Sequence, residues 1–132
     1  MISIAQSVRP VPIHLEPVVE DLLEELASRG IIRVEGPARW QSPIHLVKKK
    51  DGGVRMTVDM HQANRAVIKE TYPMHPKDAL AAKLDGAKVF SKMDIREAFW
   101  QIRLDESAQE ITTFCTHRGL YQFKVLPFEL NV

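Results

Sequence analysis

Residues 88–102 read KVFSKMDIREAFWQI, and this stretch carries the main prediction of both fold and site. Its apolar side chains predict a half-buried strand near residues 88–95: Val89, Phe90, Met93 and Ile95. Asp94 lies among them, although an unpaired carboxylate in an apolar setting costs several kcal/mol. Either a structural partner, such as backbone N–H groups or Lys92, or a bound divalent cation must therefore stabilise Asp94. Both explanations remain open on this stretch alone.

Length and composition indicate one folded domain. The 132 residues are 45% hydrophobic, which is ordinary for a globular chain. No apolar run approaches the roughly 18 residues that a membrane span needs, and the first residues lack the apolar core of a signal peptide. A single cysteine, Cys115, excludes an internal disulfide and suits a reducing compartment. We therefore expect an intracellular protein, in the cytoplasm or the nucleus, without a membrane partner.

Periodicity predicts two helices. Pro17 suits a first helical turn, and apolar residues follow at helical spacing, so an amphipathic helix is expected over residues 17–29, ended by Gly30. A second, short helix is expected from Pro76 through Leu84.

Two β-hairpins are also predicted. One spans residues 44–60 around the turn residues Asp51-Gly52-Gly53, and the other spans residues 111–125 around Arg118-Gly119. Residues 30–43, between the first helix and the first hairpin, are expected to be irregular.

The first hairpin is locally basic, with the sequence VKKKDGGVR over residues 47–55. Lysines at a hairpin tip are often only a solvated feature that protects a sheet edge. Alternatively, Lys49 and Arg55 lie on two strands joined by a glycine turn, and such a finger could close over phosphates, with arginine gripping them bidentately. The net charge of +1 does not by itself indicate a nucleic-acid partner.

Other chemistry is weakly indicated. Phe99 and Trp100 are adjacent aromatic residues that fit either a core or a stacking platform for a sugar or base. The five histidines show no metal-binding spacing with one another or with Cys115, so no zinc site is assigned. No glycine-rich phosphate loop and no set of residues typical of a serine or cysteine nucleophile emerges.

The order of these motifs resembles a known family. From about Pro12 onward, the succession SPIHLVKKKDG, VD, YP, GAKVFSKMD, TTF and LPF is similar to the reverse transcriptase of gypsy-class LTR retrotransposons and their retroviral relatives. The resemblance implies an α+β fold: the fingers and incomplete palm of a right-hand polymerase, built from antiparallel hairpins with two helices. It implies an extended lead-in at 1–16, fingers at 17–87 and a partial palm at 88–132.

The resemblance also implies a metal and nucleotide site around Asp94. Asp94 matches the catalytic carboxylate of the first palm motif, which would hold Mg²⁺, and Ile95 would add its backbone carbonyl to the same metal. The following residues would meet the triphosphate of the incoming dNTP through their backbone N–H groups: Arg96, Glu97 and Ala98.

Further positions match residues that surround the nucleotide in the family. Lys49 and Arg55 match residues that grip the triphosphate, and Phe99 matches the aromatic residue that lies under the sugar and excludes a 2′-hydroxyl. Asn64 matches an asparagine that follows the fingers strands, and Phe128 matches a residue that packs against the nucleotide. Lys48 and Lys50 are expected to contact the nucleic acid.

Two departures from the family pattern shape the functional expectation. Glu129 replaces the glycine of the family motif LPFGL, and the Y-x-D-D motif that carries the other catalytic carboxylates is absent from the sequence. The chain is therefore expected to be inactive alone, whereas the intact enzyme would use an RNA or DNA template-primer and dNTPs. An unpaired sheet edge, together with partly uncovered faces under Met93, Phe114 and Phe123, would favour self-association. The alternatives are a non-catalytic module that binds nucleic acid or protein, and a decayed gene product.

Overall fold

Five strands join into one sheet in a computed structural model that describes residues 2–131. They are β1 (Ile31–Val34), β2 (Ser42–Lys48), β3 (Val54–Val58), β4 (Phe114–Thr116) and β5 (Gly119–Phe123). Their order across the sheet is β1-β5-β4-β2-β3, and only the β2–β4 pair is parallel. The hairpin β4–β5, from the end of the chain, therefore lies between strands from its first half.

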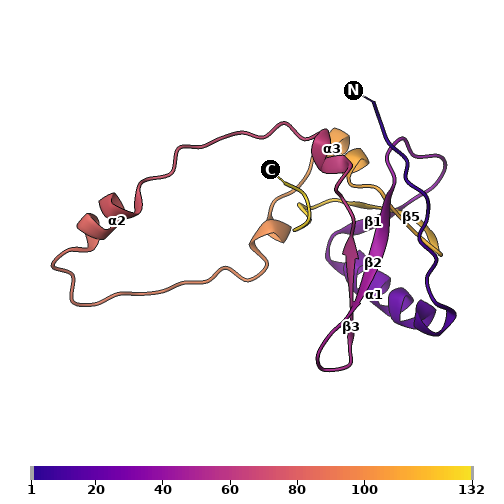
Figure 1. Cartoon of the computed structure of the whole chain (residues 1–132), viewed down its shortest axis with the longest axis horizontal. Helices are drawn as coiled ribbons and strands as arrows, with labels where there is room; N and C mark the ends of the chain where they lie inside the picture. Colours follow the sequence, from indigo (N-terminus) through magenta and orange to yellow (C-terminus); the bar gives the residue numbers. More distant parts are fainter. Residues whose placement is uncertain (1, 132) are drawn as a thin grey trace.

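Helix α1 (Glu16–Arg29) covers the sheet and confirms the helix predicted over residues 17–29 (Figure 1). Its inward residues Val19 and Leu23 are buried in one apolar cluster with side chains from the sheet and the C-terminal segment: Ile31, Ile44, Val58, Met60, Phe114, Phe123, Leu126 and Leu130. The helix ends at Gly30, where any Cβ atom would lie 2.6 Å from Val125. Glycine is therefore required by close packing at this position.

Both predicted hairpins and the short helix are confirmed, as β2–β3, β4–β5 and α2 (Lys77–Leu84). Two elements were not predicted. β1 lies in the stretch expected to be irregular, and it forms because β5, about ninety residues later, supplies its hydrogen-bond partner. A third helix, α3 (Glu106–Ile111), begins at Asp105, whose side chain accepts a hydrogen bond from the backbone N–H of Ala108 at 2.7 Å.

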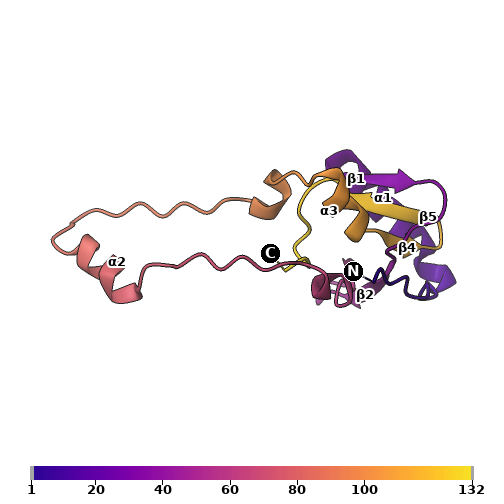
Figure 2. The same cartoon turned by 90° about the horizontal axis from the view of Figure 1, so that it is seen from above.

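The strand predicted near residues 88–95 is wrong. Residues 68–99 are all exposed and run out from the sheet and back, with α2 at the far end, as both views show (Figures 1 and 2). The apolar side chains that suggested a half-buried strand are all exposed, from 62% for Phe90 to 90% for Met93. A pattern of apolar side chains alone does not make a strand, because a strand also needs a neighbouring strand to pair with its backbone groups. No strand among residues 2–131 pairs with this segment.

The expected open edge under the second hairpin is also wrong. β4 and β5 are interior strands, and Phe114 and Phe123 are buried, at 0% and 4% exposure. The edges of the described sheet are β1 and β3. Strands from both sides of residue 88 share this sheet, and the division into fingers and palm at that residue stays a prediction. No helix in residues 2–131 combines the length and the apolarity that crossing a membrane would require.

Candidate functional site

The basic hairpin forms as expected, and its turn is well defined. The backbone N–H of Lys49 donates to the Gly53 carbonyl at 2.7 Å, and the Asp51 side chain accepts from the Gly53 N–H at 3.0 Å. Gly52 has a φ of +86°, a conformation that a residue with a Cβ atom rarely adopts. The turn therefore fixes where β3 begins, and β3 carries Arg55 opposite Val47 of β2.

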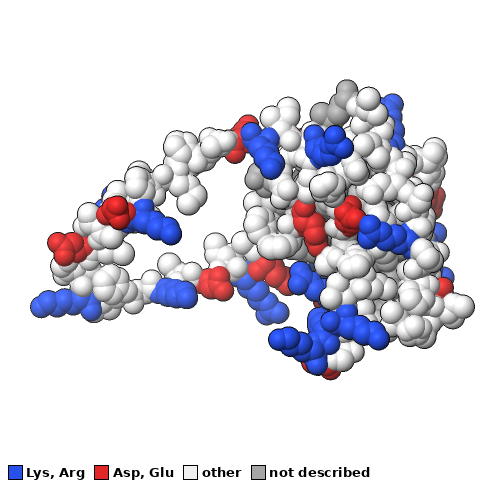
Figure 3. All heavy atoms as spheres, viewed as in Figure 1, with Lys and Arg blue, Asp and Glu red and all other residues white. Residues whose placement is uncertain are grey.

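The cations of this hairpin are accessible. Lys48, Lys49, Lys50 and Arg55 are exposed, and within residues 2–131 none of them forms an ion pair. Figure 3 shows Lys and Arg side chains gathered over the end of the β2–β3 hairpin. Four exposed cations that form no ion pair among the described residues make this tip a candidate site for a phosphate-bearing ligand.

Two of the residues predicted to contact the nucleotide pack against each other, although they are far apart in the sequence. The rings of Phe99 and Phe128 lie edge to face, with centroids 5.6 Å apart and planes at 77°. Both are partly in solvent, at 41% and 67% exposure, so the pair is not simply part of the core. An exposed aromatic pair offers ring faces and edges on which a base or sugar can pack.

Arg55 and Phe128 line one pocket of about 150 Å³. The pocket is bordered by α1, β3, the 3₁₀ turn at Ala98–Gln101 and the C-terminal segment, and its lining includes Arg55, Trp100, Phe128 and Glu129. The structure thus brings Arg55 to the same pocket as Phe128, and Phe99 packs against Phe128. Glu129, which replaces the glycine of the family motif LPFGL, also lines this pocket.

Asn64 has a role that the sequence did not reveal. Its side-chain Nδ2 donates to the carbonyl of Glu129 at 2.9 Å, and its Oδ1 accepts from the backbone N–H of Asn131 at 2.8 Å. The side chain thus spans two backbone groups of the segment that presents Phe128. Nothing in the local pattern around residue 64 could have indicated this, because its partners lie more than sixty residues away.

The segment from Asp94 to Ala98 is exposed, and Asp94 does not line the pocket that Arg55 and Phe128 share. The carbonyl of Arg96 accepts a hydrogen bond from Gln101 Nε2 at 3.2 Å. Glu97 forms an ion pair with Arg29 of α1, and this carboxylate raises the pKa of the Arg29 guanidinium. The predicted roles of Asp94, Ile95, Arg96, Glu97 and Ala98 all remain predictions.

The residues present do not complete a metal site. Among residues 2–131 there is no group of three or more His, Cys, Asp or Glu side chains close enough to hold a metal ion. Asp94 and the carbonyl of Ile95 supply oxygen atoms, which is the ligand type that Mg²⁺ prefers, but they are too few to fix its geometry.

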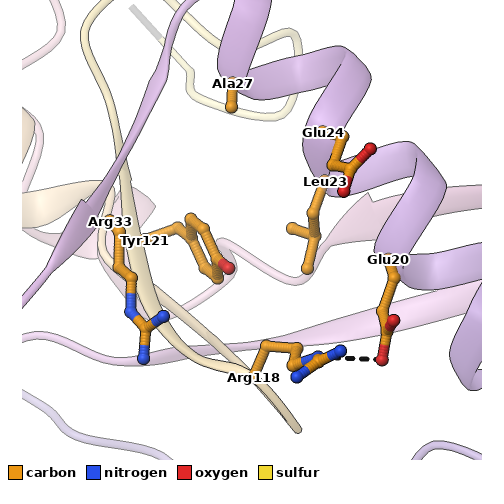
Figure 4. Close-up of a pocket in the computed structure, with 7 residues that line it drawn as sticks. All are labelled: Glu20, Leu23, Glu24, Ala27, Arg33, Arg118 and Tyr121. Carbon is orange, nitrogen blue, oxygen red and sulfur yellow. Dashed lines mark hydrogen bonds and ion pairs between the residues drawn. The ribbon is translucent and has the colours of Figure 1, made fainter.

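A second pocket, of about 240 Å³, lies between α1 and the strands β1 and β5 (Figure 4). Glu20 of α1 accepts a hydrogen bond from Arg118 Nε at 2.8 Å, and its other neighbour is His117 Nε2 at 3.3 Å. These contacts, the Arg118 bond first, hold the pKa of Glu20 below the usual range of a glutamate. This ion pair ties the helix to the β4–β5 turn, and no sequence pattern indicated it because the partners are 98 positions apart.

Comparisons with known proteins identify similar sequences over nearly the whole chain. Residues 47–130 match the family model described as reverse transcriptase (RNA-dependent DNA polymerase). The chain is 37% identical over 127 residues to the retrovirus-related Pol polyprotein from transposon opus of Drosophila melanogaster, covering 92% of this chain and 13% of that protein. It is 30% identical over 123 residues to the transposon Tf2-7 polyprotein of Schizosaccharomyces pombe, covering 93% of this chain and 9% of that one. The chain therefore spans about a tenth of the length of these relatives.

Solved structures show the same fold. The prototype foamy virus protease-reverse transcriptase superposes with a TM-score of 0.76 at 19% identity, over 96% of this chain and 17% of that one. The foamy viral protease-reverse transcriptase in complex with double-stranded DNA superposes with a TM-score of 0.69 at 20% identity, over 98% of this chain and 22% of that one. At such identities the likeness establishes the α+β fold of the matched region.

Proposed function

The chain belongs to the reverse transcriptase (RNA-dependent DNA polymerase) family, and from this premise we propose that it supplies the fingers and the first part of the palm of an RNA-directed DNA polymerase. The reaction of the whole enzyme would be transfer of a nucleotide from a dNTP to the 3′-hydroxyl of a primer, on an RNA or DNA template. Membership of the gypsy class is part of the same proposal.

The observation that carries this proposal is the pocket shared by Arg55 and Phe128, with Phe99 packed edge to face against Phe128. A nucleoside triphosphate combines a flat base and sugar with a polyanion, so its site needs aromatic surface beside a cation. Arg55 would grip the triphosphate bidentately, Phe99 would lie under the sugar, and Phe128 would pack against the nucleotide. The three side chains come from β3, the 3₁₀ turn and the C-terminal segment, so the fold itself assembles the set.

The lysines of the hairpin tip would complete the phosphate contacts. Lys49 would act with Arg55 on the triphosphate, and Lys48 and Lys50 would contact the backbone of the template-primer. Such contacts are insensitive to sequence and are weakened by salt, because each releases counterions from the nucleic acid.

The metal requirement of the proposed reaction is not met by the described residues alone. We propose that Asp94 and the backbone carbonyl of Ile95 contribute to a divalent-metal site, with Mg²⁺ as the ion. The 132 residues contain no Y-x-D-D motif that could add further carboxylates. We therefore expect the 132-residue chain, given primer-template, dNTPs and Mg²⁺, to show no primer extension above a control without protein.

Binding by the chain itself tests the proposal. Isotope-labelled chain is titrated with a dNTP in the presence of Mg²⁺ and, separately, with a short primer-template duplex. We expect the dNTP to shift resonances of Arg55, Phe99 and Phe128, and Arg55→Ala to weaken dNTP binding by about tenfold, which is the range for one charged hydrogen-bond partner.

Arg65→Ala is the matched control, because Arg65 is also exposed but does not line the pocket with Arg55 and Phe128. Resonance shifts confined to the pocket of Figure 4, or an equal effect of Arg65→Ala and Arg55→Ala, would contradict the assignment. Binding of a duplex without any dNTP response would favour a non-catalytic binding module instead.

A further inference from the structure

Arg29, the last residue of α1, contacts three side chains at once. Its Nη1 donates to Glu25 Oε1 at 3.2 Å, its Nη2 forms an ion pair with Glu97, and its guanidinium carbon lies 4.9 Å from the centre of the Trp100 ring. Glu25 belongs to the same helix. Glu97 and Trp100 belong instead to the segment that follows Asp94, so Arg29 links the helix to that segment.

Glu97 has a backbone conformation that its residue type rarely adopts. Its φ of 53° and ψ of 47° are left-handed, and within residues 2–131 it is the only non-glycine residue with a positive φ. A side chain in this conformation must be held by its surroundings, and such positions concentrate at functional sites. The ion pair with Arg29 is the contact that its carboxylate makes among the described residues.

Trp100 provides a fixed base for this arrangement. Its ring packs edge to face against the buried Phe123, with centroids 5.9 Å apart. It also closes against Gly30, where an added Cβ atom would lie 3.4 Å from the ring. A guanidinium over an aromatic face is attracted by the ring's charge distribution. The guanidinium of Arg29 therefore packs over the Trp100 ring, while its Nη2 forms the ion pair with Glu97.

We propose that Arg29 is a positioning residue for the nucleotide site. Arg29 holds Glu97 in its left-handed conformation and thereby orients the backbone N–H groups of residues 96–98. The inference rests on the proposed function, in which these N–H groups face the triphosphate of the dNTP. Arg29 itself touches no reacting group. It acts at the end of α1, outside the motifs that suggested the site.

The first test needs no ligand. Amide resonances of residues 96–99 and the indole resonance of Trp100 are recorded in the 132-residue chain, in Arg29→Ala and in the matched pair Glu97→Gln and Glu25→Gln. Each glutamine variant removes one carboxylate from the same guanidinium. We expect Glu97→Gln and Arg29→Ala to displace these resonances and Glu25→Gln to leave them in place. Equal displacement by both glutamine variants, or none with Arg29→Ala, would overturn the inference.

The second test measures dNTP binding with Mg²⁺ present. Arg29→Ala should weaken dNTP binding by about tenfold while duplex binding is unchanged, and Arg29→Lys should have a smaller effect because it keeps the charge but not the planar group. Adding Glu97→Gly to Arg29→Ala should recover most of the loss, since glycine adopts a positive φ without strain. Failure of this recovery in a folded double variant would overturn the positioning role.

The two tests separate the inference from the proposed function. If the unmodified chain binds no dNTP, the proposed function fails for this chain, and the resonances of residues 96–99 still decide whether Arg29 holds the turn. If the chain binds dNTP and Arg29→Ala binds it equally well, the proposed function stands and the role of Arg29 is refuted. Thermal unfolding of each variant shows whether a loss reflects the site or the fold.

Discussion

Asn64 holds the backbone of Glu129 by a hydrogen bond of 2.9 Å, across 65 positions of the sequence. With the second bond, from the N–H of Asn131, one side chain fixes the segment that carries Phe128. The fold thus sets the position of a candidate nucleotide contact through a residue that contacts no nucleotide.

Asn64→Ala should lower the free energy of unfolding by about 1–2 kcal/mol, because the variant cannot form two hydrogen bonds that each contribute about 1 kcal/mol. Chemical denaturation checks this value. Asn64→Asp keeps the acceptor for Asn131 but removes the donor to Glu129, so its destabilisation should also be measurable. The control is Asn131→Ala, which keeps the backbone N–H and should be close to neutral.

Phe99 should determine the choice of sugar. If the ring lies under the sugar, Phe99→Val should admit ribonucleotides and leave dNTP use comparatively intact, because a smaller side chain leaves room for a 2′-hydroxyl. The measurement is the ratio of kcat/KM for dNTP and rNTP, in a polymerase that joins this chain to the remaining palm and thumb of a relative. An unchanged sugar preference would leave Phe99 as a packing partner of Phe128.

In the same joined polymerase, Asp94→Ala should reduce activity by orders of magnitude.

Local elements were predicted well from the sequence, and pairings between distant segments were not. Helix α1 and the hairpin β2–β3 follow from apolar spacing and turn residues, which are properties of neighbouring positions. β1 was missed because a short run of four residues becomes a strand only beside β5. The strand expected around Asp94 does not form, because no strand among the described residues pairs with this segment.

The candidate site shows the same contrast between local patterns and contacts of distant residues. Candidate residues such as Lys49, Arg55 and Phe99 could be proposed from motifs, because chemistry restricts which side chains can hold a phosphate or a ring. The contacts that Asn64 makes with Glu129 and that Arg29 makes with Glu97 join positions at least 65 residues apart. No local pattern encodes such a contact.

Nucleic-acid binding should depend on salt through the hairpin tip. Each phosphate of duplex DNA that the protein no longer neutralises should reduce the slope of log K against log salt by roughly 0.9, so Lys48→Ala with Lys50→Ala should flatten it by roughly twice that value. Fluorescence anisotropy over a range of salt concentrations measures the slope. The matched control is Arg65→Ala with Lys69→Ala, which removes the same charge outside the hairpin. A slope that falls equally in both double variants would indicate general electrostatic attraction instead of a defined site.

The ion pair between Glu20 and Arg118 should make stability depend on pH. Because the folded state lowers the pKa of Glu20, its contribution is present above the pKa of the unfolded chain and is lost as the pH falls through the lower, folded value. Glu20→Gln should therefore reduce Tm near neutral pH and have little effect once the pH is below the lowered, folded pKa of Glu20. Glu24→Gln is the control, since Glu24 lines the same pocket and makes no ion pair within residues 2–131. Equal pH profiles for the two variants would refute the assignment.

Amide hydrogen exchange should distinguish two parts of the second half of the chain, one protected and one that exchanges rapidly. β4 and β5 are interior strands with buried partners, so their amides should be among the best protected, together with α1. Residues 68–99 are exposed throughout and should exchange rapidly.

The same exposed segment should drive self-association. Its large apolar side chains include Tyr72, Val89 and Met93, each at least 85% exposed, and exposed apolar surface of this kind favours association. We expect the apparent mass in analytical ultracentrifugation to rise with concentration, and Val89→Lys with Met93→Lys to suppress the rise. Ile2→Lys with Ile13→Lys is the control, because these residues are equally apolar and exposed but lie at the other end of the chain. Strong protection of residues 88–95 in a concentration-independent monomer would show that this segment closes onto the protein's own surface, and would overturn the prediction.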